Sequence, residues 1–122
     1  MAVDVSAGAA WVDAIAAQDF SRLESLLADD VRFRALIPSG LREAESATDA
    51  AARIGAWFGD GDPLELVESR VEEIVDRLHV SYRFRSFEEG RWHLVEQHAY
   101  CTLADGKIAA VDLVCSGFRP VD

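Results

Sequence analysis

The chain has 122 residues, half of them hydrophobic, which is enough for one core and too few for two, so we expect a single domain over residues 1–122. It carries 22 acidic and 12 basic side chains, a formal net charge of -10, which repels phosphate backbones and anionic lipids and argues against nucleic-acid and membrane partners. No stretch approaches the roughly eighteen apolar residues of a membrane span, and no basic segment opens the chain as in a secretion signal. We therefore expect a cytoplasmic protein.

The first third of the chain reads as two helices followed by a strand. Over residues 7–18 apolar side chains recur every three or four positions, and a second such pattern follows Asp19, a suitable N-cap, and ends near Asp30. Residues 31–37 then alternate between apolar and polar side chains, which is the period of a half-buried strand, until Pro38 breaks it.

A third helix and a series of strands account for the rest. Ser46 or Thr48 can cap the helix, which ends at the glycine- and aspartate-rich stretch 59–63. Strands with turn signals between them follow over residues 64–75, 78–87, 91–103 and 107–116, and residues 117–122 form a tail. Helices first and a strand meander afterwards indicate an α+β fold.

The turn at residues 88–90 decides which side chains of the two flanking strands share a face. A three-residue loop with Gly90 in the left-handed conformation pairs Phe87 with Arg91. A two-residue loop would mix Arg83 and Arg85 with the apolar side chains, so we expect the three-residue loop. The apolar face that it predicts contains Leu78, Val80, Tyr82, Phe84, Ser86, Trp92, Leu94, Glu96, His98 and Tyr100.

Glu96 and His98 carry the acid–base chemistry of this predicted apolar face, with Tyr82 across from Glu96. Residues two apart on a strand lie about 7 Å apart, so a carboxylate and an imidazole at these positions can reach one ligand, and either can act as acid or base near neutral pH. We therefore expect Glu96 and His98 to be a catalytic pair. A metal site built from Glu96, His98 and Tyr82 lacks a further histidine or cysteine ligand, so we expect neither a metal nor another cofactor.

The next turn, at residues 104–106, admits two registers. With Asp105 and Gly106 as a two-residue loop, Asp112 points away from the pocket. With a three-residue loop, Asp112 lies beside His98 and can orient it. The apolar pattern of the last strand favours the first register.

The strings AWVDAIAAQDFSRLESLLADDVRF, AARIGAWF and ADGKI, in this order, resemble the SnoaL-like branch of the nuclear-transport-factor-2-like superfamily across nearly the whole chain. This branch includes polyketide cyclases and ketosteroid isomerases. The resemblance implies one SnoaL-like domain over residues 1–122, folded as a cone-shaped half-barrel. In such a fold three N-terminal helices pack on a curved, mainly antiparallel sheet, a pocket opens between them, and a homodimer usually forms through the outer sheet face.

The isomerase pattern of that family does not carry over residue by residue. Its first-helix tyrosine aligns with Trp11, its first-strand base with Ala35, which cannot accept a proton, and its protonated aspartate with His98. Ketosteroid isomerisation by the usual route is therefore disfavoured.

The sequence thus predicts a cofactor-free isomerase, cyclase or dehydratase that acts by proton transfer on a small hydrophobic metabolite. The alternatives are a non-catalytic ligand-binding or dimerisation domain of the same fold, and a structural domain whose interior is filled. The side chains expected to line the substrate pocket are Trp11, Phe33, Trp57, Phe58, Tyr82, Trp92, Tyr100 and Leu113.

Overall fold

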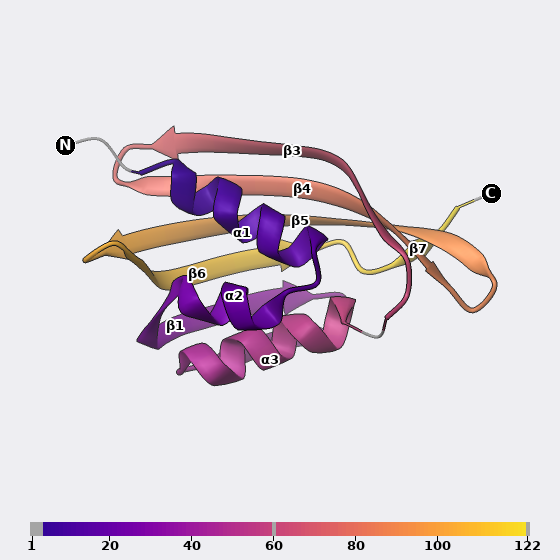
Figure 1. Cartoon of the computed structure of the whole chain (residues 1–122), viewed down its shortest axis with the longest axis horizontal. Coiled ribbons are helices and arrows are strands. Elements are labelled where there is room, and N and C mark those ends of the chain that lie inside the picture. The colour runs from indigo at the N-terminus through magenta and orange to yellow at the C-terminus, as the bar shows by residue number, and fades with distance from the viewer. Residues whose placement is uncertain (1–3, 60, 122) are drawn as a thin grey trace.

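The computed structural model describes residues 4–59 and 61–121 (Figure 1). In chain order its elements are α1 (Ser6–Ala16), α2 (Phe20–Ser25), β1 (Leu27–Ile37), β2 (Gly40–Ala44), α3 (Ala47–Phe58), β3 (Leu64–Ile74), β4 (Arg77–Glu88), β5 (Arg91–Ala104), β6 (Lys107–Cys115) and β7 (Arg119–Pro120).

Side-chain caps set the start of two helices where the sequence predicts them. The Oδ1 of Asp19 accepts a hydrogen bond from the backbone N–H of Arg22 and begins α2. The Oγ of Ser46 accepts from the N–H of Asp49 and begins α3, so Ser46 is the cap and Thr48 is not. The second helix ends earlier than expected, because Leu27 already pairs with Ile108 as part of the sheet.

The predicted strands are confirmed, and two further ones lie where the sequence indicated none. β2 forms a hairpin with β1 across the break at Pro38, and the two-residue β7 pairs with β5 in the segment expected to be a tail. Within the stretch predicted to end α3, Asp60 lies outside the described residues.

The strands form one sheet in the order β2-β1-β6-β5-β4-β3, with β7 beside β5. The pairing of β1 with β6 is parallel, and the other pairings are antiparallel. All three helices lie on one side of the sheet, with α1 against β3 and β4 and α3 against β1 and β2 (Figure 1). The expected α+β class and the curved, open, mainly antiparallel sheet of a cone-shaped half-barrel are confirmed.

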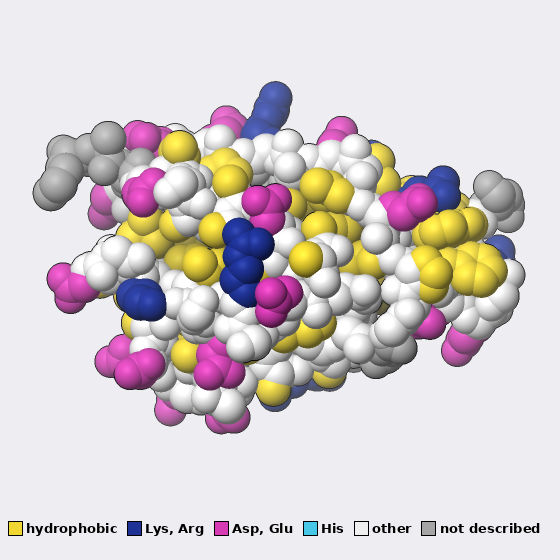
Figure 2. Space-filling view, viewed as in Figure 1, with side chains coloured by type: hydrophobic (Ala, Val, Ile, Leu, Met, Phe, Trp, Pro, Cys, Tyr) yellow, Lys and Arg dark blue, Asp and Glu magenta, His cyan; other side chains and the backbone are white. Residues whose placement is uncertain are grey.

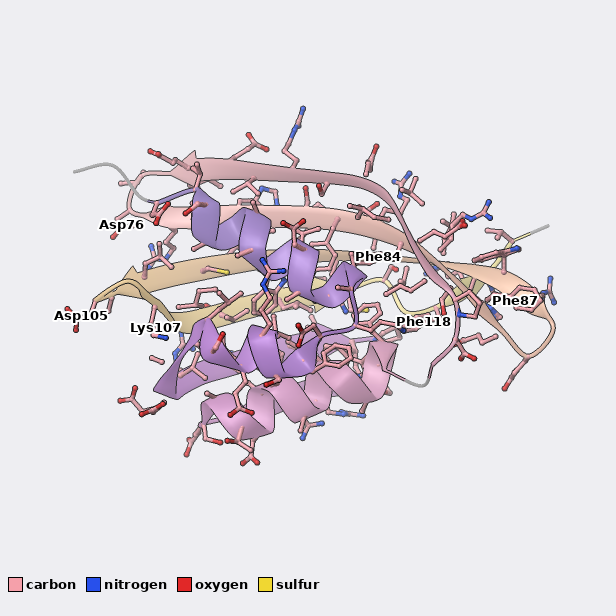
Figure 3. All side chains as sticks on the ribbon, in the orientation of Figure 1. Asp76, Phe84, Phe87, Asp105, Lys107 and Phe118 are labelled. Atoms are coloured by element: carbon pink, nitrogen blue, oxygen red, sulfur yellow. The ribbon has the colours of Figure 1, made fainter. Side chains whose placement is uncertain are left out.

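The helices cover what we call the inner face of the sheet, and the opposite side is its outer face. The core lies between the helices and the inner face, where the ring of Phe58 contacts those of Phe84 and Phe118 at centroid distances of 5.6 and 5.7 Å. The side chains of Phe84 and Phe118 are labelled in Figure 3. Asp and Glu side chains are scattered around the helix side of the molecule (Figure 2). Within the described residues, no helix combines the length and apolar character needed to cross a bilayer.

Candidate functional site

The hairpin between β4 and β5 has a two-residue loop, so the predicted three-residue register is wrong. Glu88 pairs with Arg91 and Phe87 with Trp92, and the loop residues Glu89 and Gly90 have φ angles of 52° and 79°. Two successive positive φ angles are typical of the tight turn whose twist matches that of the flanking strands. The shift by one residue exchanges the two faces of β5 relative to β4.

The observed register places Arg83 and Arg85 on the same face as Trp92 and Leu94, an arrangement that seemed unfavourable from sequence. Contacts of the two arginines stabilise this face. Arg83 lies directly across from Glu96 and forms an ion pair with it, with 2.6 Å between Nη2 and Oε1. The guanidinium carbon of Arg85 lies 4.3 Å from the centre of the Trp92 ring, a cation–π contact. An arginine therefore has partners on this face that a strict division into apolar and polar positions overlooks.

In the observed register, Glu96 and His98 lie on the outer face and Gln97 takes the inner position. Gln97 is 1% exposed and pairs with Tyr82, whereas the side chains of Glu96 and His98 are 36% and 39% exposed. The expectation that Glu96 and His98 enter an apolar interior beside Tyr82 is corrected accordingly. The family carry-over of His98 to the pocket wall is corrected too, because Gln97 and Ala99 face inward there.

The inner face instead contains a short hydrogen-bonded chain of buried polar groups. The indole Nε1 of Trp11 donates to the hydroxyl of Tyr82 at 3.0 Å, and that hydroxyl donates to Oε1 of Gln97 at 2.6 Å. Burial raises the pKa of Tyr82, so the hydroxyl stays neutral. Nε2 of Gln97 is buried without a hydrogen-bond partner. Sequence reasoning missed Gln97 because the wrong register assigned it to the polar face.

The side chains expected to line an apolar substrate pocket divide between core and outer face. Trp57 is half-buried and packs on Phe33 with ring centres 6.4 Å apart. Trp92 and Tyr100 lie on the outer face, contrary to prediction, because they alternate in phase with Glu96. The remaining five are buried in the core: Trp11, Phe33, Phe58, Tyr82 and Leu113.

A cavity of about 430 Å³ opens on the outer face over β3, β4 and β5. It lies on the side turned away from the viewer in Figure 1, opposite the helices. Its lining is charged and hydroxyl-bearing rather than apolar, which differs from the expected pocket. The principal lining side chains are Glu68, Arg70, Ser81, Arg83, Glu96 and His98.

Glu96 is fixed at this cavity by hydrogen bonds to both carboxylate oxygens. Arg83 donates to Oε1 from Nε at 2.9 Å and from Nη2 at 2.6 Å, and Nε2 of His98 lies 2.8 Å from Oε2. The backbone N–H of Glu96 donates to Oγ of Ser116. The bonds from His98 and Arg83 lower the pKa of Glu96, so its carboxylate is ionised near neutral pH.

His98 connects this carboxylate to a second imidazole. Its Nδ1 lies 2.9 Å from Nε2 of His79, and the two rings meet edge to edge, with planes inclined by 19° and centroids 5.1 Å apart. The His79 ring in turn stacks on Tyr100 at 4.7 Å, and its Nδ1 lies 4.0 Å from Oε1 of Glu72. Sequence reasoning could have found His79 only with the correct register. In that register Ser81 lies opposite His98, and His79 lies two residues before Ser81 on the same face of β4.

Asp112 also faces outward, in the register that the sequence favoured. Asp105 and Gly106 form the two-residue loop, and Asp112 pairs with Arg32 at 3.3 Å rather than with His98. Within residues 4–59 and 61–121, the histidine, cysteine, aspartate and glutamate side chains form no cluster of three or more suited to a metal ion.

This combination of sheet, helices and element order agrees with the sequence comparison. A sequence model of the SnoaL-like domain matches residues 9–111. The chain belongs to the SnoaL-like domain family. A search of curated proteins by sequence found no significant match for this SnoaL-like chain.

Solved structures with the same fold differ widely in sequence from this SnoaL-like chain. A candidate polyketide cyclase from Pseudomonas putida KT2440 is 18% identical over 93% of this chain and 91% of its own, with a TM-score of 0.72. An LEH-like epoxide hydrolase from M. tuberculosis is 14% identical over 92% and 81% of the two chains, with a TM-score of 0.69. A protein of ketosteroid isomerase-like fold from Catenulispora acidiphila DSM 44928, in complex with trimethylamine, is 11% identical over 96% and 88%, with a TM-score of 0.71.

Proposed function

We propose that this SnoaL-like chain is a cofactor-free proton-transfer enzyme, an isomerase, cyclase or dehydratase, whose catalytic pair is Glu96 and His98 in the outer-face cavity. The observation that carries the proposal is the Glu96 carboxylate, hydrogen-bonded to Arg83 and His98 at the wall of a cavity large enough for a small molecule. Family membership and the named activities of the structural neighbours support a small-molecule reaction of this class.

Glu96 is the proton acceptor in this proposal. Each carboxylate oxygen has two acceptor sites; Arg83 uses both on Oε1, while His98 uses one on Oε2. The remaining site on Oε2 accepts a proton from a carbon next to a substrate carbonyl. The electron pair of the broken C–H bond forms a double bond to the carbonyl carbon, and the π pair of the carbonyl moves to its oxygen. When the carbonyl re-forms, the pair of the carbon–carbon double bond takes the proton back from Glu96 at another carbon of the product.

The cavity lining favours a substrate with a polar reacting end. The hydroxyl of Ser81 and the guanidinium of Arg70 lie at the same cavity and supply donors for the oxyanion that develops at the carbonyl. We therefore narrow the small hydrophobic metabolite expected from sequence to a small carbonyl compound that presents its polar end to Arg70 and Glu96.

Proton exchange into a simple ketone tests this proposal without knowledge of the natural substrate. Cyclohex-3-en-1-one is incubated with the protein in D₂O, and loss of the α-proton signal is followed by NMR. We expect Glu96→Gln to lower the protein-dependent rate by about 100-fold or more, the usual contribution of a general base. Asp112→Asn, on the same face but paired with Arg32, is the control and keeps the rate. Full exchange by a folded Glu96→Gln variant would refute the proposal.

A second candidate function is self-association through the other half of the outer face. Leu36 and Leu41 pair across β1 and β2, and they are 52% and 46% exposed; Val114 on β6 is 51% exposed beside them. Together with Arg34 and Asp112 they line a shallow groove of about 400 Å³. The balance of basic and acidic groups here lets a second copy approach, although the whole chain carries a charge of -10.

Sedimentation equilibrium tests the homodimer. We expect the wild-type chain to dimerise and Leu36→Glu combined with Val114→Glu to be monomeric, because the symmetric contact would then bury four carboxylates. Leu66→Glu, an exposed β3 position outside the groove, serves as the control. A wild-type protein that stays monomeric at millimolar concentration contradicts this second function and leaves the first intact.

A further inference from the structure

The donors and acceptors along Glu96, His98 and His79 can be assigned in sequence from the carboxylate outward. An ionised carboxylate only accepts hydrogen bonds, so Nε2 of His98, 2.8 Å from Oε2 of Glu96, carries a proton. In a neutral His98 the other nitrogen, Nδ1, is then an acceptor. Nε2 of His79, 2.9 Å away, must therefore donate to it. This leaves Nδ1 as the acceptor nitrogen of a neutral His79.

Both ring nitrogens of His98 are thus occupied, although His98 is the histidine that lines the cavity. The ring nitrogen that can still take up a proton is Nδ1 of His79, which lies 4.0 Å from the carboxylate of Glu72. When that nitrogen is protonated, the shared proton can move from Nε2 of His79 to Nδ1 of His98. His79 is then neutral again, with its proton toward Glu72, and the positive charge lies on His98 beside Glu96.

We propose that His79 is a positioning residue of the Glu96 site and forms, with His98, a two-imidazole relay that carries a proton from the Glu72 side of the outer face to the cavity. One proton is taken up at Nδ1 of His79 and one moves from Nε2 of His79 to Nδ1 of His98, so the positive charge passes from one ring to the other and no co-reactant is needed. The functional consequence rests on the proposed role of Glu96, because a cationic His98 stabilises the carboxylate and weakens it as a base.

Charged groups on the neighbouring strands act on the two histidines of the relay. From β3, Glu72 faces His79 and is itself 3.7 Å from Arg70. From β5, Tyr100 stacks on His79, and from β4, Arg83 binds the carboxylate that His98 contacts. On β6, Asp112 lies directly across from Tyr100 and forms an ion pair with Arg32. Glu72 is therefore the charge that acts directly on the uptake end, Nδ1 of His79. Glu96 is the charge that acts on the delivery end, Nε2 of His98.

Histidine ¹⁵N NMR over a pH titration of the full chain tests the relay without any substrate. At high pH we expect both rings to carry their proton on Nε2, with a scalar coupling across the hydrogen bond between Nε2 of His79 and Nδ1 of His98. As the pH falls, both rings should respond at one common midpoint, because they share one proton. His93, the third histidine of the chain, is the internal reference.

A double-mutant cycle separates a relay from a purely structural stack. Glu72→Gln removes the charge at the uptake end, so the midpoint of His98 should move to lower pH with that of His79. In a His79→Phe background, which keeps the stacked ring and removes both nitrogens, Glu72→Gln should leave His98 unchanged. If His79→Phe does not fold, His79→Gln, which keeps a side-chain donor but cannot take up the proton, replaces it with the same expectation.

Two outcomes would overturn the relay. One is independent titration of His79 and His98 in the wild-type chain without coupling between them. The other is an equal response of His98 to Glu72→Gln with and without His79. A chain that passes these tests but exchanges no ketone protons keeps the relay and loses the proposed enzyme activity, so the two failures are distinguishable.

Discussion

Arg83 and Glu96 face each other directly across β4 and β5, and two nitrogens of Arg83 donate to the same carboxylate oxygen at 2.9 and 2.6 Å. Replacement of Arg83 by Met removes both donors and keeps most of the aliphatic stem. We expect the pKa of Glu96 to rise, because only His98 then favours its ionised form. Carboxyl ¹³C NMR measures this directly. Arg32→Met, which removes the partner of Asp112 on the same face, should leave the titration of Glu96 unchanged.

The ionisation of Glu96 also makes the free energy of unfolding depend on pH. Because folding lowers the pKa of Glu96, its contribution to stability is complete above the unfolded value of about 4.3 and disappears as the pH falls through the lower folded value. Urea unfolding of wild type and Glu96→Gln should therefore differ most at neutral pH and converge in the acid range. A difference that grows as the pH falls would contradict this assignment. The effect is modest because Glu96 is partly exposed.

The buried hydrogen-bond chain of Trp11, Tyr82 and Gln97 predicts a large loss of stability for the conservative replacement of Tyr82 by Phe. Tyr82→Phe removes the acceptor for Trp11 and the donor to Gln97, so two buried polar groups lose their partner. We expect a loss of about 3 kcal/mol in the free energy of unfolding. Tyr100→Phe, at a position 40% exposed, removes an equivalent hydroxyl and should change stability by less than about 0.5 kcal/mol. Similar losses for both variants would mean that the buried chain contributes little.

Two glycines on helices should respond oppositely to alanine. A Cβ at Gly8 in α1 would lie 2.6 Å from Cγ1 of Val71 and 3.0 Å from Cγ2 of Val80, so Gly8→Ala pushes α1 away from the sheet and should cost about 1–2 kcal/mol. A Cβ at Gly55 in α3 meets the ring of Phe20 at an ordinary 3.4 Å. Gly55→Ala should stabilise the chain by about 0.5–1 kcal/mol through helix propensity. Chemical denaturation of both variants gives the signs, and stabilisation by Gly8→Ala would exclude the close approach.

The tip of the β3–β4 hairpin holds a residue in an unfavourable conformation. Val75 has a φ angle of 57°, which disfavours β-branched side chains, and it is 93% exposed, so few contacts compensate. Val75→Asn should raise the free energy of unfolding by about 1 kcal/mol, since asparagine tolerates this region. Val75→Thr keeps the branch and should have no effect. Equal stability of all three proteins would show that the turn relaxes at no cost.

The fold could be predicted from sequence to a large extent because most elements have a strong local signal. Periodic apolar side chains and the caps Asp19 and Ser46 locate the helices, and turn residues separate the strands. β2 was not predicted because a five-residue strand with one buried side chain, Ala44, has no recognisable period. The two-residue β7 has no local sequence signal, since its place depends on pairing with β5.

The pairing of Glu96 with His98 could be predicted from sequence, but neither the face on which they lie nor the other residues of the cavity could. Glu96 and His98 do lie together, yet a loop shorter by one residue moves both to the opposite face. The sequence argument assumed that arginines and aromatic residues avoid each other on a sheet. Arg85 over Trp92 shows why that assumption fails, because a guanidinium plane packs on an indole as readily as an aliphatic chain does.

The position of β3 at the end of the sheet has a practical consequence for handling the protein. One side of this eleven-residue strand has no neighbour in the described sheet order, and four glutamates, Arg70 and a register irregularity between Leu66 and Glu68 discourage another strand from joining it. Because the isoelectric point is about 4.6, mild acid removes the net negative charge that keeps copies of the chain apart. Purification and storage well above pH 5 should keep the protein from aggregating along this edge.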